Sequence, residues 1–129
     1  MAKDKEAKKI VMIVEDDEML LRALYLAFLH SGFTIATASD GETAVRMTER
    51  LKPDLVLLDL LLPKMSGFEY LQAIKANPDL KDTPVIILSN LGDKGDMEKA
   101  KGLGAADYFI KANTDLSVLA KKVNDLLKV

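Results

Sequence analysis

Five short apolar runs recur along the chain, at a spacing that leaves room for one helix between each pair. They occupy residues 10–14, 33–38, 55–58, 85–88 and 108–110, and their first residues lie 22 to 30 positions apart. Several of them show no alternation of polar and apolar residues, which is typical of strands buried on both faces of a parallel sheet. The pattern therefore predicts five strands in one sheet.

The segments between these runs carry helix signals such as capping boxes, glycines and prolines. We predict five helices. The first spans 19–29, the second follows a capping box at 39–42 and runs to about 51, and the third follows a capping box at 66–69 and ends at 76. The fourth spans 93–103, and the fifth runs from a cap at Asn113 or Thr114 to the C-terminus. Alternating strands and helices predict right-handed crossovers and a doubly wound α/β sandwich. We expect a single domain that fills residues 1–129, with a core of about 9–128.

The bulk properties of the chain limit its possible functions. None of the 129 residues is a cysteine, which excludes disulfides and thiolate metal sites. Residues 10–14 are too short a run for a signal peptide or a membrane span, so we expect a cytoplasmic protein without membrane contact. A formal net charge of −2 gives no sign of a nucleic-acid surface. Because the last predicted helix reaches the end of the chain, we expect no DNA-binding or enzymatic effector.

Reactive side chains follow the predicted strands, at the points where the strands end. An acidic triplet at 15–17 follows the first strand, and Asp59, Ser89 and Lys111 follow the third, fourth and fifth. Ligands of open α/β sheets bind beyond the carboxyl ends of the strands, so we expect these side chains to meet. Two carboxylates about 4 Å apart repel by roughly 4 kcal/mol at an effective dielectric near 20, unless a proton or a cation compensates them. An all-oxygen donor set favours Mg²⁺, with one carboxylate available as a nucleophile toward phosphorus.

Five motifs, in this order and spacing, resemble the response-regulator receiver domains of two-component signalling over essentially the whole chain. They are VEDD at 14–17, PDLVLLD at 53–59, LLLPKMSG at 60–67, VIILS at 85–89 and GAADYFIK at 104–111. The resemblance implies a flavodoxin-like (βα)5 sandwich with a parallel sheet in the order 2-1-3-4-5. It also implies the stand-alone architecture of chemotaxis-type receivers.

The resemblance assigns roles at a magnesium site. Asp59 would be the phosphoacceptor and a metal ligand, and Asp16 would bind Mg²⁺ directly. Glu15 would act on the metal largely through water, and the backbone carbonyl of Leu61 would be a further ligand. Asp17 fits a helix N-cap better than a metal ligand.

The resemblance also implies a switch and its partners. Ser89 would hydrogen-bond the phosphoryl group, Lys111 would pair with it, and Tyr108 would change rotamer with the state of Ser89. An ordinary half-buried strand aromatic explains Tyr108 equally well. The phosphoryl group would come from a histidine kinase or a histidine phosphotransfer protein. A downstream protein would recognise the face of the fourth helix, fifth strand and fifth helix. We expect a signalling switch and not an enzyme, as a monomer or weak homodimer.

Four positions depart from the family pattern or vary within it. The lysine is usually followed by a proline after a cis peptide bond, whereas Ala112 follows Lys111, which puts the reach of the lysine in question. Asn90 stands where a very small residue is usual. Leu61 and Leu91 occupy the positions two beyond Asp59 and Ser89, which in the family help to set how long the phosphoryl group lasts.

Three other functions remain as alternatives. A haloacid-dehalogenase-type phosphatase needs a second aspartate where Leu61 stands. A flavodoxin-like FMN carrier needs a phosphate loop where the acidic triplet 15–17 stands. A degenerate receiver that only binds other proteins, independently of phosphorylation, is favoured only by Ala112 and Asn90. Outside the motifs, we interpret His30 as a surface residue.

Overall fold

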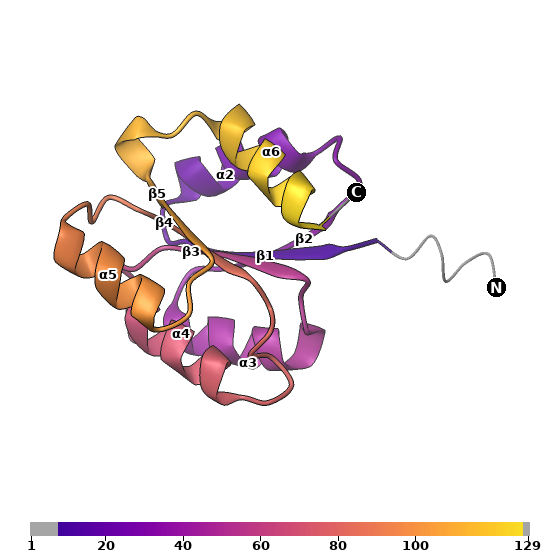
Figure 1. Cartoon of the computed structure of the whole chain (residues 1–129). Coiled ribbons are helices and arrows are strands. Elements are labelled where there is room, and N and C mark those ends of the chain that lie inside the picture. The colour runs from indigo at the N-terminus through magenta and orange to yellow at the C-terminus, as the bar shows by residue number, and fades with distance from the viewer. Residues whose placement is uncertain (1–7, 128–129) are drawn as a thin grey trace.

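The structure, a computed structural model, describes residues 8–127, so the two ends of the predicted domain lie outside the described residues. Five parallel strands form one sheet in the order β2-β1-β3-β4-β5, which confirms the predicted fold (Figure 1). The strands are β1 (Ile10–Val14), β2 (Thr34–Ala38), β3 (Leu55–Leu58), β4 (Val85–Ser89) and β5 (Asp107–Ile110). Two strands match the predicted bounds to the residue, and the other three differ by one residue.

Helices cover both faces of the sheet. They are α2 (Glu18–Phe28), α3 (Gly41–Leu51), α4 (Gly67–Ala76), α5 (Lys94–Gly102) and α6 (Leu116–Leu127), with a 3₁₀ turn η1 (Lys111–Asn113) after β5. Figure 1 shows α2 and α6 on one face of the sheet and α3, α4 and α5 on the other. A helix joins each strand to the next one along the chain, as the crossovers of a parallel sheet require.

Polar side chains at the helix starts explain where three helices begin. The Asp17 carboxylate accepts hydrogen bonds from the first turn of α2, as expected for an N-cap. Ser66 and Glu69 form the predicted capping box of α4. The predicted capping box at 39–42 is wrong: the N-cap of α3 is Asp40, whose Oδ1 accepts from the Thr43 amide at 2.8 Å.

The start of α6 also differs from the prediction. Neither Asn113 nor Thr114 caps it, because residues 111–113 form the 3₁₀ turn. Asp115 takes the capping role, since its Oδ1 accepts from the Ser117 amide at 2.9 Å. The turn between strand and helix is thus longer than the sequence suggested, and Thr114 is left free for another contact.

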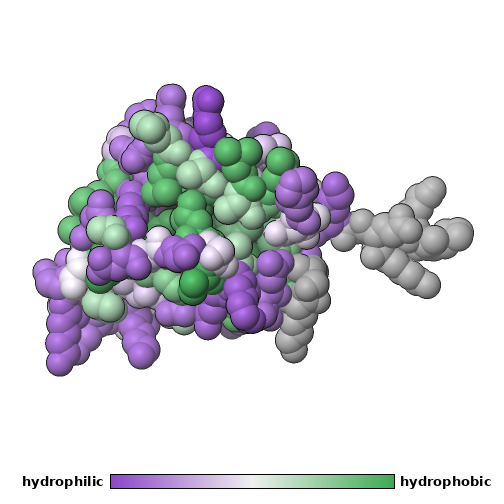
Figure 2. Space-filling view, turned by 90° about the horizontal axis from the view of Figure 1, so that it is seen from above, coloured by the Kyte–Doolittle hydropathy of each residue, from purple (hydrophilic) through white to green (hydrophobic). Residues whose placement is uncertain are grey.

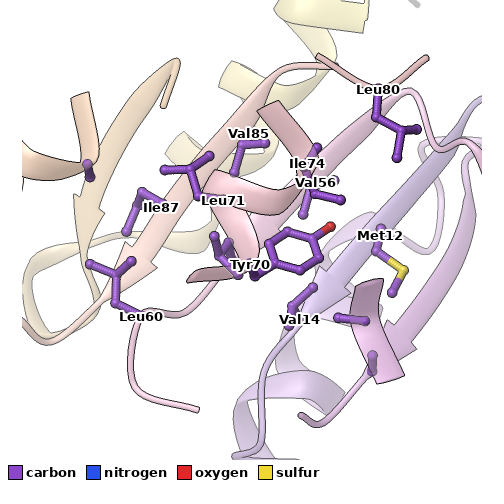
Figure 3. Close-up of a cluster of buried hydrophobic side chains, with 14 residues drawn as sticks. Met12, Val14, Val56, Leu60, Tyr70, Leu71, Ile74, Leu80, Val85 and Ile87 are labelled. Atoms are coloured by element: carbon purple, nitrogen blue, oxygen red, sulfur yellow. The ribbon is translucent and has the colours of Figure 1, made fainter. Parts of the chain in front are cut away.

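Two apolar clusters hold the layers together. On one side, Val11, Ile13 and other strand residues pack against α2 and α6 around Leu24 and Phe28. On the other side, Met12 and Val14 join a cluster with residues of α4, shown in Figure 3. Successive residues of β1 thus enter opposite clusters, which is the alternation that a pleated strand imposes.

Exposed apolar side chains gather on the outer surface of α2 and α6. Figure 2 views this face and shows hydrophobic residues among hydrophilic ones. The exposed large side chains on these two helices are Met19, Tyr25, Leu26, Val118 and Leu126. Among residues 8–127, no helix has the length and apolar character to cross a bilayer.

A buried polar contact between Thr48 and Tyr70, at the cluster that contains Met12 and Val14, provides a test of its packing. The Thr48 hydroxyl bonds to the Ala44 carbonyl at 2.7 Å and lies 2.7 Å from the Tyr70 hydroxyl. Because threonine has a single hydroxyl proton, Tyr70 must donate to Thr48. Burial raises the pKa of Tyr70 to about 12, against the lowering effect of this hydrogen bond.

We expect Tyr70→Phe to cost about 1 kcal/mol at pH 8, because Thr48 loses a buried partner. The deficit should shrink above pH 10 and be cancelled or reversed by pH 11.5. Above pH 10 the unfolded chain releases the proton of the Tyr70 hydroxyl, whereas the folded protein retains it up to about pH 12. The free energy of unfolding of the parent therefore falls by roughly 1 kcal/mol per pH unit between pH 10 and pH 12. Urea unfolding at pH 8 and 11.5 measures both values, with Tyr25→Phe at the exposed tyrosine as control. An equal deficit at both pH values would contradict the prediction.

Candidate functional site

The sheet register brings two carboxylates to neighbouring strand ends. Val14 and Leu58 are partners in the β1–β3 ladder, so Glu15 and Asp59 leave the sheet side by side. The backbone amide of Asp59 donates to the Val14 carbonyl at 3.0 Å, and that of Glu15 donates to the Ala38 carbonyl at 2.9 Å. Backbone hydrogen bonds therefore fix the positions of Glu15 and Asp59 independently of the contacts that their side chains make.

Lys111 links these two carboxylates. Its Nζ lies 2.7 Å from Glu15 Oε1 and 2.9 Å from Asp59 Oδ2. The second oxygens are also engaged, because Glu15 Oε2 accepts from the Asp17 amide at 2.9 Å and Asp59 Oδ1 accepts from the Leu61 amide at 3.2 Å. Glu15 and Asp59 are only 2% and 4% exposed, so the ion pairs are shielded from solvent.

The charges at this edge affect the titration of Glu15 and Lys111. Burial raises the pKa of Glu15, helped by the nearby Asp59 carboxylate and opposed by the hydrogen bonds from Lys111 and Asp17. Burial alone would lower the pKa of Lys111, but its bonds to Glu15 and Asp59 outweigh that effect and raise it. Lys111 is therefore held as an ammonium between the two carboxylates.

A third carboxylate completes an acidic group that can hold a metal. Glu15, Asp16 and Asp59 each offer an oxygen, and these atoms lie within 4.8 Å of one another. Asp16 is exposed while the other two are buried, so the group opens to solvent on one side. Three carboxylates and the Lys111 ammonium sum to a formal charge of −2, which a divalent cation would balance. The donor set is all oxygen, and such a set fits Mg²⁺.

The predicted switch residues are joined to each other and not to this acidic group. Ser89 is fully buried at the end of β4, and its Oγ accepts from the Leu91 amide at 3.3 Å. The hydroxyl of half-buried Tyr108 donates to the Leu91 carbonyl. The peptide groups of Leu91 thus connect the two side chains. The sequence did not indicate this link, because it uses backbone atoms whose position no side-chain motif specifies.

The structure places three of the four unusual positions. No peptide bond among residues 8–127 is cis, so the bond between Lys111 and Ala112 is trans, and Lys111 still contacts both carboxylates. Asn90 is exposed, beside the fully buried Ser89. Leu61 is 57% exposed, and its amide bonds to the Asp59 carboxylate.

Comparison with known proteins agrees with the fold and shows the family. Residues 11–124 match the family model described as the response regulator receiver domain, so the chain belongs to the receiver domain family. It is 37% identical over 108 residues to the probable transcriptional regulator ycf27 of Guillardia theta, covering 84% of this chain and 41% of that protein. The chain spans less than half the length of the curated relatives it matches.

Solved receiver structures are also similar. The receiver domain of the sensor histidine kinase PA1611 from Pseudomonas aeruginosa, with magnesium coordinated in its active-site cleft, has a TM-score of 0.84 and 25% identity, covering 95% of this chain and all of that one. The phosphorylated cyanobacterial phytochrome response regulator RcpA has a TM-score of 0.78 and 32% identity, covering 95% and 93%.

Proposed function

We propose that this receiver domain accepts a phosphoryl group on Asp59 from a phosphohistidine of a partner protein, in a reaction that depends on Mg²⁺. The observation that carries the proposal is the position of Asp59. It directly follows the central strand β3, is almost fully buried, bonds to Lys111 and is grouped with Glu15 and Asp16. An oxygen of the Asp59 carboxylate attacks phosphorus, the bond from phosphorus to the histidine nitrogen breaks, and the imidazole leaves. The products are an acyl phosphate and a free histidine.

The surrounding residues support this chemistry in separate ways. A divalent cation held by Glu15, Asp16 and Asp59, with the Leu61 carbonyl as a further ligand, would neutralise negative charge on the phosphoryl oxygens. Lys111 already donates to Asp59 and supplies a second positive charge. Ser89 would hydrogen-bond the phosphoryl group after leaving its contact with Leu91. The domain catalyses its own modification and acts as a switch, not as an enzyme that turns over separate substrates.

Two surface features support protein partners. Met19 is 84% exposed in the first turn of α2, two residues beyond the N-cap Asp17, so an apolar surface lies beside the acidic group for a donor protein. A cavity of about 350 Å³ lies between α5 and β5 and is lined by Met97, Lys101 and Tyr108, among others. We propose that the face of α5, β5 and α6 changes with phosphorylation and is recognised by a downstream protein.

The same site argues against a degenerate receiver. The three carboxylates and the lysine are all in place, and Lys111 contacts Asp59 although Ala112 follows it. A module that served only for protein contacts would have no need of a buried carboxylate pair, which is costly to desolvate.

We expect the protein to gain one phosphoryl mass when incubated with acetyl phosphate and Mg²⁺, and to gain none when EDTA replaces the metal. Acetyl phosphate is a small donor, so the result does not depend on knowing the partner. Intact-mass spectrometry measures the labelled fraction over time. Labelling that is equally fast in EDTA would contradict the metal dependence, and no labelling in either condition would favour the phosphorylation-independent module.

We expect the phosphoryl group to be long-lived, because water must attack phosphorus in line with the leaving Asp59 oxygen. Leu61 and Leu91 flank the site without a polar group to orient such a water. A Leu61→Asn, Leu91→Glu double variant should lose its label at least about tenfold faster, a change of about 1.4 kcal/mol in the barrier. Loss of label in Mg²⁺ after removal of acetyl phosphate gives both rates. Leu26→Asn, at a leucine of similar exposure on α2, is the control, and equal rates for parent and double variant would refute the role of the leucines.

A further inference from the structure

The side chain of Thr114 closes the segment that follows β5. Its hydroxyl donates to the Ile110 carbonyl at 2.7 Å, and its backbone amide donates to the Lys111 carbonyl at 3.4 Å. The Ile110 carbonyl belongs to the planar peptide group that also contains the Lys111 nitrogen. A hydrogen bond to this carbonyl therefore fixes the plane from which the Lys111 side chain departs.

This hydroxyl is not used to cap α6. The carboxylate of Asp115 accepts from both the amide and the hydroxyl of Ser117, at 2.9 and 2.8 Å, and so performs that task. Thr114 instead donates backwards, to the last residue of β5. That residue, Ile110, is the register partner of Ser89. The contact therefore lies at the functional edge of the sheet, and the start of α6 does not need it.

The position of Lys111 demands such an anchor. β5 is an edge strand, and β4 separates it from β3 and β1, which carry Asp59 and Glu15. Strands lie about 4.8 Å apart, so two strand spacings separate β5 from β3 and three separate it from β1. Lys111 has to reach across the end of β4 with a flexible four-carbon stem to place Nζ on both carboxylates. A lysine side chain that spans this distance has no spare length to compensate for a displacement of the Lys111 backbone.

We propose that Thr114 is a positioning residue that holds Lys111 on Glu15 and Asp59 by fixing the Ile110 carbonyl. The placement of Lys111 stands independently of phosphorylation, whereas its chemical consequence rests on the proposed function. Thr114 touches neither the carboxylates nor the phosphoryl group, so it acts only through Lys111. The hydroxyl is the group that matters, which makes Thr114→Val and Thr114→Ser a matched pair of variants.

The first measurement observes Lys111 directly and needs no phosphorylation. In ¹⁵N-labelled protein, a shielded, ion-paired ammonium exchanges its protons slowly and gives an NH₃⁺ signal, which Lys111→Ala assigns by its disappearance. We expect Thr114→Val to shift this signal to the position of free lysines or to broaden it away, and Thr114→Ser to keep it. An unchanged Lys111 signal in folded Thr114→Val would overturn the proposal, as would its loss in Thr114→Ser.

The second measurement tests the consequence with beryllofluoride and Mg²⁺ as the probe. We expect Thr114→Val to bind about tenfold more weakly than the parent, as for other supports of a metal site, and Thr114→Ser to restore binding. In a Lys111→Ala background, Thr114→Val should cause no further loss. A further tenfold loss there would show that Thr114 acts independently of Lys111 and would overturn the proposal. If the parent itself fails to bind beryllofluoride, the proposed function fails, and the Lys111 signal still decides the role of Thr114.

Discussion

Gly67→Ala is expected to destabilise the protein by about 3 kcal/mol and to lower its melting temperature by on the order of 10 °C. Gly67 begins α4, and its amide donates to the Leu60 carbonyl at 2.9 Å. A Cβ built on Gly67 would lie 2.6 Å from the Leu60 Cα and still closer to the Asp59 carbonyl oxygen. These are backbone atoms of the segment that carries Asp59, so they cannot move aside without disturbing the site.

Gly102→Ala provides the matched control for this steric effect. Gly102 is the last residue of α5, and a Cβ there would meet nothing within 4 Å. Alanine in a helix is favoured over glycine by up to about 1 kcal/mol, so this variant should be as stable as the parent or slightly more stable. Thermal unfolding of the three proteins decides the matter. A Gly67→Ala protein as stable as the parent would show that α4 does not pack against the Asp59 backbone as described.

Asp59→Asn is expected to abolish acyl-phosphate formation without unfolding the protein. An amide cannot serve as the nucleophile, and the neighbouring carboxylates of Glu15 and Asp16 belong to a different strand end. The fold should survive because Lys111 keeps its ion pair with Glu15 at 2.7 Å. Removing one of two adjacent buried carboxylates also relieves their repulsion. We therefore expect the free energy of unfolding without metal to change by no more than about 1 kcal/mol.

The comparison is made by intact mass after acetyl phosphate treatment and by urea unfolding of the same samples. Asp125→Asn, at an exposed aspartate on α6, serves as the control and should label like the parent. Labelling of folded Asp59→Asn at the rate of the parent would place the acceptor elsewhere.

The sequence predicted the inner strands of the sheet well because β1, β3 and β4 are buried on both faces. Residues 11–14 and 55–58 are all buried, and such runs are recognisable without any knowledge of their neighbours. The predictions failed where tertiary contacts or local backbone geometry determine where an element begins. Phe33 was assigned to a strand, yet it lies just before β2 and packs its ring 6.0 Å from that of Phe28. The cap of α6 was misplaced because a 3₁₀ turn at 111–113 leaves no distinctive side-chain pattern.

The methionines show the same limit. Methionine is a common filler of hydrophobic cores, but of Met12, Met19 and Met47 only Met12 is fully buried, and Met19 is 84% exposed. Met19 lies five residues before the buried Leu24, which places it about 140° around α2 from that side chain. The exposed position of His30 was predicted correctly.

The charged residues of the site could be predicted from the sequence, but the hydrogen bonds that link its backbone and side chains could not. Glu15, Asp16, Asp59 and Lys111 could be placed together because parallel strands deliver their carboxyl ends to one edge. The hydrogen bonds through the Leu91 backbone, and that of Thr114 to Ile110, could not be predicted, because they depend on loop conformations. The same holds for the close approach of Gly67 to the segment after β3.

The most direct test of the central claim is to locate the modified residue. Borohydride reduces an acyl phosphate of aspartate to homoserine, so protein labelled with acetyl phosphate and Mg²⁺ can be reduced, digested and mapped by mass spectrometry. We predict homoserine at position 59 and at no other aspartate. Homoserine at position 16 or 17, or labelled protein with no homoserine at all, would contradict the assignment of Asp59 as the phosphoacceptor.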